Sequence, residues 1–569
     1  MKLTSIMNQY SKSLSSKFKV ADTIVIIGFT LFLFTYFLGR WKGAYPFVFL
    51  GSDAANIANF AAGWDHPDLF QKDFFLSNQD NFRFYATIHI PLIRLLANII
   101  GDYGSAFISL LIPHIFLQAC GFYILGRVIF QSRYWGAFLA VVTLIPVWLN
   151  LGTYWGIYID PQPRFSFQVL LPYLLASAYY WRTKLTVWPW LMVAAGGFIY
   201  IHPVSAPGWA IAIWLGFWFF LPASFSIQKR LAYMFFVGAI CCGVTLPWLI
   251  HYLSNHAHGA TDNYSQIYEA LASNWGEGFL DIPLAVKGFI SLIWQKGILP
   301  LAIVSIVLVV WLRRNELKSV MLLLIWLAGI LLVAVGIPWI EQTIAQTNEA
   351  IPAQVDLIRG IRYLVPLMLL FIVWTLAEIS QQFSSTKVKI ATTSIGIALI
   401  FWLTVQPTPP TVRIPNQLNY TLSCWREGKL TCTPKDYIEI IEGLNKIKQL
   451  TPQSTILPLD KIGKRLSLPI RYYSLQPLVY AFKDRAALSY ANHSKFLKWI
   501  QRNEQVQLLE EQKAPEDKLK GIIELSNNWE VQYCLTEPSI NDAVVKPPYS
   551  NKLEIIYTNS LMTLLKIKK

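Results

Sequence analysis

The chain has 569 residues, of which 54% are hydrophobic and 14% charged, and its formal net charge is +15 at pH 7. Because soluble globular proteins carry about 25% charged residues, this composition excludes a soluble enzyme, a disordered chain and a fibrous protein. Apolar runs of about 20 residues, long enough to cross a bilayer, recur between Asp22 and Val405. The sequence therefore predicts a polytopic α-helical membrane protein.

The apolar runs predict about eleven transmembrane helices. A further run at 86–100 is short and contains His89, Pro91 and Arg94, so it is interpreted as a helix lying in the membrane interface, with a twelfth span as the alternative. Lysine and arginine favour the first interpretation, because it places the greater share of them in short loops on the cytoplasmic side. The predicted spans are roughly 22–39, 105–126, 134–150, 166–181, 186–201, 208–222, 231–253, 297–312, 318–337, 360–380 and 390–405.

Three parts follow from this pattern. Residues 1–21 are predicted to form a polar cytoplasmic tail, and no small-residue cleavage site follows the first apolar run, which is therefore expected to stay as an anchor. Residues 22–405 form the transmembrane domain, whose first outside loop, 40–104, is far longer than a connector needs. Residues 406–569 begin with a proline-rich linker and, because the span number is odd, are expected to form a soluble domain on the outer side.

The C-terminal domain is predicted to be mixed α/β. Cys424 and Cys432 are disulfide candidates, and a bridge between them would require an oxidising compartment. The stretch from Arg471 to Arg502 is dense in aromatic and basic residues and is interpreted as an ordinary core with a solvated rim, with a glycan-binding face as the alternative. The pattern predicts helices at 435–449 and 493–512, strands at 454–459 and 477–482, and a closing hairpin of 552–557 and 561–568.

The first outside loop carries the leading catalytic candidate, Asp53, which small residues follow at helical spacing. A carboxylate just beyond the first span could accept a proton from a hydroxyl nucleophile while the rest of a substrate stays in lipid. The alternative is that Asp53 caps a helix beginning at Ala54. Lys72 and Asp73, further along the loop, are supporting candidates.

The second outside loop supplies Asp160 as a second catalytic candidate and Arg164 as a supporting one. The alternative for Asp160, which precedes a proline, is a turn that opens the next helix. His202, at the outer end of the fifth predicted span, is interpreted as a hydrogen-bonding residue at a helix end, with a catalytic base as the alternative.

Arg359, Arg362 and Tyr363 begin the tenth predicted span and are candidates for binding a phosphate. The two arginines are three residues apart and share one helix face. Arginine's planar fork suits phosphate, and burying two arginines at the edge of a span is costly without an anionic partner. The alternative is that both reach out to lipid headgroups.

A metal site is not predicted. His251, His256, His258 and Asp262 lie close together in the sequence, but their spacing matches no recognised ligand pattern and indicates a flexible polar loop. A divalent metal stays open as a cofactor, although nothing in the sequence requires one. There is no Walker motif or phosphate-cradling glycine-rich loop, so an ATP-driven pump is not expected, nor is a nucleic-acid partner.

Together these features resemble the GT-C glycosyltransferases, polytopic enzymes that use lipid-linked sugar donors. The resemblance is carried by the long first outside loop with an acid after span one, by the acid in the second loop, and by the segment Gly121-Phe-Tyr-Ile-Leu-Gly-Arg127-Val-Ile-Phe-Gln-Ser-Arg133. That segment looks like the "LLYLLGRRLFGRR" passage joining spans two and three in bacterial members. The similarity covers about residues 20–180, and beyond them only the topology agrees. One departure is Ala54, where many members carry a second acid.

The resemblance implies that Asp53 is the catalytic base or essential carboxylate, that Asp160 positions the acceptor, and that Arg359 and Arg362 hold the phosphate of a polyprenyl-phosphate sugar. The acceptor would be a glycan, a lipid or a protein at the outer face of a bacterial inner (plasma) membrane, in cell-envelope polysaccharide synthesis. The alternatives are a transport protein for lipid-linked glycans, a polysaccharide polymerase or ligase, and a non-catalytic scaffold.

Overall fold

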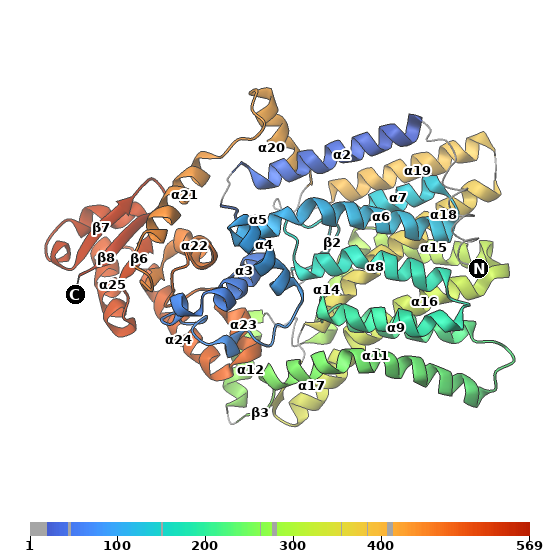
Figure 1. The fold of residues 1–569 in the computed structure, drawn as a ribbon, viewed down its shortest axis with the longest axis horizontal. Helices are drawn as coiled ribbons and strands as arrows, with labels where there is room; N and C mark the ends of the chain where they lie inside the picture. Colours follow the sequence, from blue (N-terminus) through green and yellow to red (C-terminus); the bar gives the residue numbers. More distant parts are fainter. Residues whose placement is uncertain are drawn as a thin grey trace.

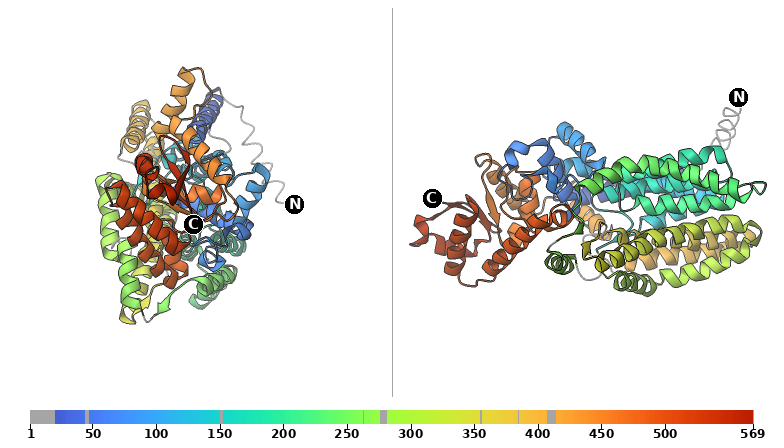
Figure 2. Two further views of the ribbon diagram at one scale, coloured as in Figure 1. Left: turned by 90° about the vertical axis from the view of Figure 1, so that its left-hand side faces the viewer. Right: turned by 90° about the horizontal axis from the view of Figure 1, so that it is seen from below.

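The computed structural model describes residues 20–43, 47–149, 152–261, 263–275, 281–353, 356–383, 385–406 and 414–568. Most of the cytoplasmic tail expected at 1–21, the linker residues 407–413 and Asp262 lie outside the described residues. Figures 1 and 2 show an elongated molecule, with a bundle of roughly parallel helices along most of its length and a mixed helix–sheet region at one end.

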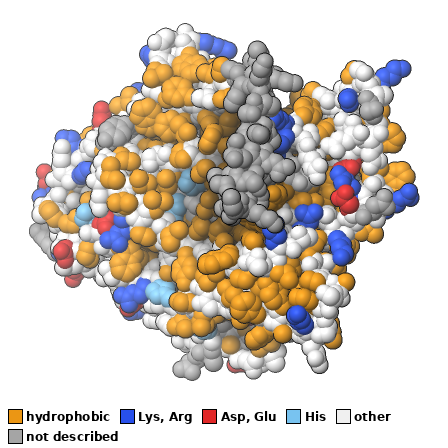
Figure 3. All heavy atoms as spheres, turned by 45° about the vertical axis from the view of Figure 1, so that its right-hand side comes forward, with side chains coloured by type: hydrophobic (Ala, Val, Ile, Leu, Met, Phe, Trp, Pro, Cys, Tyr) orange, Lys and Arg blue, Asp and Glu red, His pale blue; other side chains and the backbone are white. Residues whose placement is uncertain are grey.

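The bundle is built around α18 (Leu364–Gln382), which is buried along almost its whole length. By contrast, α11 (Ile227–Asn255) and α19 (Thr386–Val405) expose large apolar side chains such as Phe235 and Phe401. Figure 3 shows hydrophobic side chains spread over much of one face of the bundle, as expected of a surface that contacts lipid. The other bundle helices are α2 (Val20–Trp41), α6 (Leu111–Phe130), α7 (Arg133–Leu144), α8 (Pro163–Tyr180), α9 (Trp188–Gly197), α10 (Ala206–Phe217), α11 (Ile227–Asn255), α14 (Ile282–Gln295), α15 (Ile298–Leu312), α16 (Leu317–Leu331), α17 (Ile337–Thr347) and α19 (Thr386–Val405).

Among the described residues, five helices are long and apolar enough to cross a membrane, or six if the pair α14–α15, bent by 78°, counts as one span. Four of the other predicted spans coincide with shorter apolar helices, and the predicted span at 166–181 is α8, which is not among these apolar helices. The protein is thus a polytopic helical membrane protein, and the count of eleven spans stays a prediction. The long helices are Tyr103–Phe130, Ile227–Asn255, Leu317–Thr347, Leu357–Gln382 and Thr386–Val405.

The first outside loop folds into two helices at the end of the bundle, α3 (Ser52–Asp65) and α4 (His89–Ile100). The next helix, α5 (Tyr103–Ser109), is the first part of the long apolar helix Tyr103–Phe130. Helix α4 lies within the run at 86–100. It has 12 residues and buries one face while exposing Leu95 and Ile99 on the other, and its position in the membrane interface stays a prediction. Its Arg94 Nε donates to Asp65 Oδ1 over 2.6 Å and so ties α4 to α3.

The C-terminal region contains a four-stranded sheet in the order β5-β6-β8-β7. The pair β5–β6 is parallel and the other pairs are antiparallel; β7 and β8 form the predicted closing hairpin. The predicted helices correspond to α21 and α24, and Cys424 and Cys432 form a disulfide with 5.6 Å between Cα atoms. The elements are α20 (Ile414–Arg426), α21 (Lys435–Lys448), β5 (Ile456–Pro458), α22 (Asp460–Tyr472), α23 (Asp484–Ala491), α24 (His493–Glu510), α25 (Pro515–Trp529), β6 (Tyr533–Thr536), α26 (Asn541–Val544), β7 (Leu553–Thr558) and β8 (Thr563–Ile567).

The strand predicted at 477–482 is wrong. Leu478 makes only an isolated bridge to Ile456. The backbone N–H of Leu478 donates to Asp73 Oδ2 over 2.7 Å, and its carbonyl accepts the N–H of Phe74 over 2.8 Å. The first outside loop therefore takes the hydrogen bonds that a second strand partner would have used.

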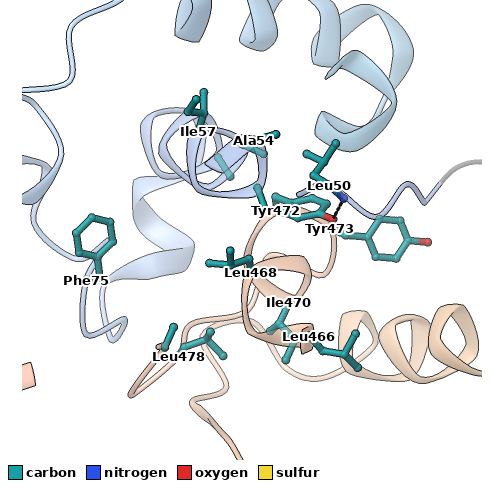
Figure 4. Packing of buried hydrophobic residues seen from close by; sticks show 14 of the residues in the cluster. Leu50, Ala54, Ile57, Phe75, Leu466, Leu468, Ile470, Tyr472, Tyr473 and Leu478 are labelled. Atoms are coloured by element: carbon teal, nitrogen blue, oxygen red, sulfur yellow. Dashed lines mark hydrogen bonds between the residues drawn. The ribbon is translucent and has the colours of Figure 1, made fainter. Parts of the chain in front are cut away.

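The first outside loop and the C-terminal region share one hydrophobic core. Figure 4 shows Ala54 of α3 close to Tyr472 of α22, with the Leu50 N–H bonded to the Tyr472 hydroxyl. Two segments more than 400 residues apart in the sequence thus form one unit at the end of the bundle, and this unit borders the cavity described next.

Candidate functional site

A cavity of about 350 Å³ lies where the first outside loop, the bundle and the C-terminal region meet. The elements that supply its walls are α3, the start of α8, the turn before α10, the 3₁₀ helix η8 (Leu357–Tyr363) and α23. Four of the ionisable side chains are basic and two are acidic, so the cavity favours an anion. The charged and histidine side chains lining it are Asp53, Arg164, His202, Asp356, Arg359, Arg362 and Lys483.

Asp53 lies in the first turn of α3, whose N-cap residue is Gly51, so Asp53 does not occupy the capping position. Its carboxylate instead forms ion pairs with Arg164 and with the Nζ of Lys483, the latter at 3.0 Å. Burial alone would raise the pKa of Asp53, but the positive charges of Lys483, Arg164 and Arg359 outweigh it and hold the pKa well below its usual value. Asp53 is therefore an ionised carboxylate that joins three parts of the chain.

Arg362 is 2% exposed and lines the cavity. Its Nη2 donates to Ser205 Oγ over 3.2 Å, while its Nη1 is buried without a hydrogen-bond partner among the described residues. No described carboxylate forms an ion pair with Arg362. By contrast, Arg359 Nε lies 3.5 Å from Asp356 Oδ1. Among the described residues, Arg362 is thus a buried cation of the cavity wall whose charge no carboxylate neutralises directly.

His202 and Tyr363 meet at the same serine. His202 Nδ1 lies 2.7 Å from Ser205 Oγ, and the Tyr363 hydroxyl donates to that oxygen over 2.6 Å. Tyr363 does not line the cavity; its ring packs edge-on against Trp155 and Trp209. Tyr363 is therefore linked to the side chains of the cavity wall through its hydrogen bond to Ser205.

Asp160 lies outside the cavity walls and is fully buried. Its carboxylate forms an ion pair with Arg40 and accepts the backbone N–H of Gly51 over 2.6 Å. Since Gly51 precedes α3 and Asp53 lies two residues later, Asp160 holds the chain that carries Asp53. A Cβ at Gly51 would stand 2.7 Å from Asp160 Oδ2, so the close approach requires a glycine.

The two supporting candidates of the first loop also lie away from the cavity. Lys72 is exposed. Asp73 is buried and pairs with Arg471, which in turn pairs with Asp484. Sequence reasoning missed Lys483, because a single lysine in a stretch rich in basic and aromatic residues carries no signal of its own.

No group of three or more histidine, cysteine, aspartate or glutamate side chains that could hold a metal occurs in the described part of the chain. His251 Nε2 bonds the carbonyl of Arg83 at 2.9 Å, and His258 Nδ1 bonds the carbonyl of His256 at 2.8 Å. These two imidazoles are thus engaged with the backbone.

No known family model matches the sequence, and no curated protein matches it. Among solved structures, the chain aligns with ArnT from Cupriavidus metallidurans, a crystal structure bound to undecaprenyl phosphate. The alignment covers 96% of this chain and 98% of that chain, with 12% sequence identity and a TM-score of 0.44.

Proposed function

We propose that this protein is a membrane glycosyltransferase that moves a sugar from a polyprenyl-phosphate donor to an acceptor at the outer face of the membrane. The observation that carries the proposal is Arg362, a buried guanidinium that lines the cavity without a described carboxylate partner. Leaving such a charge uncompensated costs several kcal/mol, so an anionic group of the substrate is its natural partner. The resemblance of residues 20–180 to GT-C glycosyltransferases suggests that this anion is a polyprenyl phosphate.

In this proposal Arg362 and Arg359 bind the phosphate. A guanidinium can donate two parallel hydrogen bonds to phosphate oxygens, which fixes the orientation of the group as well as its charge. Arg362 lies at the start of Leu357–Gln382, one of the helices apolar enough to cross the membrane. A phosphate bound at this end of the helix would leave its lipid tail alongside the bundle.

In this proposal Asp53 is the general base that accepts the proton of the acceptor's hydroxyl group. The acceptor's hydroxyl oxygen attacks the anomeric carbon, the bond from that carbon to the phosphate oxygen breaks, and polyprenyl phosphate leaves with the bonding electrons. The hydroxyl proton passes to Asp53. Because Lys483 and Arg164 keep Asp53 a weak base in the free protein, we propose that the incoming phosphate draws these cations away and strengthens it.

Asp160 serves as a positioning residue, since it reaches Asp53 through Gly51 rather than through the cavity. The disulfide Cys424–Cys432 supports a C-terminal domain on the oxidising, periplasmic side, with the N-terminus cytoplasmic. We propose the bacterial inner membrane as the location and a glycan, lipid or protein as the acceptor.

The test uses the purified full-length chain in lipid nanodiscs. Binding of a radiolabelled polyprenyl monophosphate should weaken at least about tenfold in Arg362→Ala, because a hydrogen bond to a charged group contributes about 1.5–3 kcal/mol. Arg83→Ala, at an exposed position outside the cavity, is the control. Equal binding by wild type and Arg362→Ala would overturn the proposal.

Turnover is tested with a panel of radiolabelled polyprenyl-phosphate sugars. Asp53→Asn keeps the size of the side chain but loses the carboxylate, so sugar transfer or hydrolysis should vanish while lipid binding persists. Binding by the wild type without turnover of any donor would instead favour a non-catalytic or transport protein for lipid-linked glycans.

A further inference from the structure

Three side chains converge on the hydroxyl of Ser205, which lies in the turn before α10. Tyr363 donates its hydroxyl proton to Ser205 Oγ over 2.6 Å, and Arg362 Nη2 donates over 3.2 Å. His202 Nδ1 lies 2.7 Å from the same oxygen. Ser205 is 2% exposed, so these partners, and not solvent, determine the direction of its proton.

The number of hydrogen bonds that a hydroxyl can form determines the tautomer of His202. A serine oxygen accepts two hydrogen bonds and donates one. Arginine can only donate, so Arg362 and Tyr363 together use both accepting positions of Ser205. The Ser205 proton is then left for His202 Nδ1, which must be the unprotonated nitrogen. In a neutral imidazole the proton is therefore on Nε2.

The surroundings keep this imidazole neutral. Burial lowers the pKa of His202 well below its usual value, and the positive charges of Arg362, Arg164 and Arg359 lower it further, while Asp53 opposes them only in part. His202 lines the cavity and is 8% exposed. A nitrogen that already carries the proton of a neutral ring cannot act as a general base.

We infer that His202 presents its Nε2–H to the cavity as a neutral hydrogen-bond donor to the phosphate held by Arg362. The inference rests on the proposed function and adds a third donor residue, beside Arg359 and Arg362, to that site. A neutral donor beside Arg362 adds a hydrogen bond without adding repulsion between like charges. When the bond to the sugar breaks, negative charge grows on the leaving phosphate oxygen, and a donor already in place stabilises it.

Two amide variants separate this role from general-base catalysis. In His202→Gln the amide nitrogen occupies about the position of the histidine Nε2 and can still donate a hydrogen bond into the cavity. In His202→Asn the shorter amide can still accept from Ser205 but places no donor there. We expect His202→Asn to lose at least about tenfold in kcat and in affinity for polyprenyl monophosphate, the value of one hydrogen bond to a charged group. His202→Gln should stay within about threefold of wild type, a difference well under one such bond.

The pH dependence gives an independent readout. Since a neutral donor does not titrate in the working range, wild type and His202→Gln should show the same acid limb of kcat against pH. If His202 were the base, both variants would lose activity alike, and the wild type would show a limb near the ordinary histidine pKa of about 6.5 that both variants lack. That result would overturn the inference.

The tautomer is measured directly by ¹⁵N NMR of the full-length chain labelled with [¹⁵N]histidine, with His202→Asn used to assign the signal among the eight histidines. Near neutral pH, without donor, we expect a protonated Nε2 and an unprotonated Nδ1. Ser205→Ala should give a mixture of tautomers. A protonated Nδ1 or an imidazolium refutes the inference even if polyprenyl phosphate binds. Failure of the wild type to bind that lipid, with the tautomer as expected, refutes the proposed function instead.

Discussion

The Arg471 side chain forms a buried ionic link between the first outside loop and the C-terminal region. Its Nε and Nη2 each donate to Asp73 over 2.8 Å, and its Nη1 and Nη2 donate to Asp484 over 2.5 and 2.9 Å. All three side chains are 0% exposed. Replacing Arg471 with Met keeps most of the side-chain length but leaves two buried carboxylates without this cation.

The expected loss follows from that geometry. Removing one partner of a buried ion pair costs about 3–5 kcal/mol, because the remaining charge is uncompensated. Here one cation serves two carboxylates, so we expect Arg471→Met to lower the free energy of unfolding by about 5 kcal/mol, the upper end of that range. Activity should fall as well, because Lys483 directly precedes Asp484 and faces Asp53.

The loss in free energy of unfolding caused by Arg471→Met should become smaller as the pH falls. Burial raises the pKa of Asp484 above its ordinary value even though Arg471 opposes the change. Without Arg471 the pKa in the folded protein rises further, and protonation then favours the folded state over the unfolded one. The difference between Arg471→Met and wild type should therefore shrink as the pH falls towards about 4, the usual carboxyl range.

Denaturant unfolding of the purified chain in detergent, followed by tryptophan fluorescence, measures this change. The matched control is Arg83→Met in the same loop, whose ion pair with Asp80 at 3.2 Å is 45% and 64% exposed at its two side chains. An exposed pair of this kind contributes at most about 1 kcal/mol. If Arg471→Met and Arg83→Met lower the free energy of unfolding by the same amount, the buried triad of Asp73, Arg471 and Asp484 does not hold the two regions together.

Three further substitutions test the site. Lys483→Met removes the largest positive influence on Asp53 in the free protein, so the pKa of Asp53 should rise and the acid limb of kcat/KM, which reports the free enzyme, should move to higher pH; an unmoved limb contradicts this. Asp160→Asn leaves Arg40 buried without its carboxylate and should cost about 3–5 kcal/mol in the free energy of unfolding, whereas a catalytic Asp160 would lose activity at unchanged stability. Gly51→Ala should lower kcat severalfold, because its Cβ pushes against Asp160 and shifts α3; wild-type kcat would show that the close approach is not needed.

The sequence alone determined the features that depend on local pattern. Hydrophobic runs identify a membrane protein, the alternating segments at the C-terminus identify the β7–β8 hairpin, and a short spacing makes Cys424 and Cys432 disulfide candidates. The apolar run at 86–100 likewise predicts a helix, which is α4. Each of these properties is set by residues within about 20 positions of one another, the length of one membrane-spanning helix.

The tertiary structure alone decided which charges meet. Asp53 and Asp160 look alike in the sequence, as loop acids after a span, yet one lines the cavity and the other is buried against Arg40. Lys483 reaches Asp53 across 430 positions of sequence, and in the strand predicted at 477–482 the backbone N–H and carbonyl of Leu478 bond to the first loop. The physical reason is that a buried charge or backbone group is satisfied by whichever partner the closed fold brings within about 3 Å, and spacing along the chain does not determine that partner.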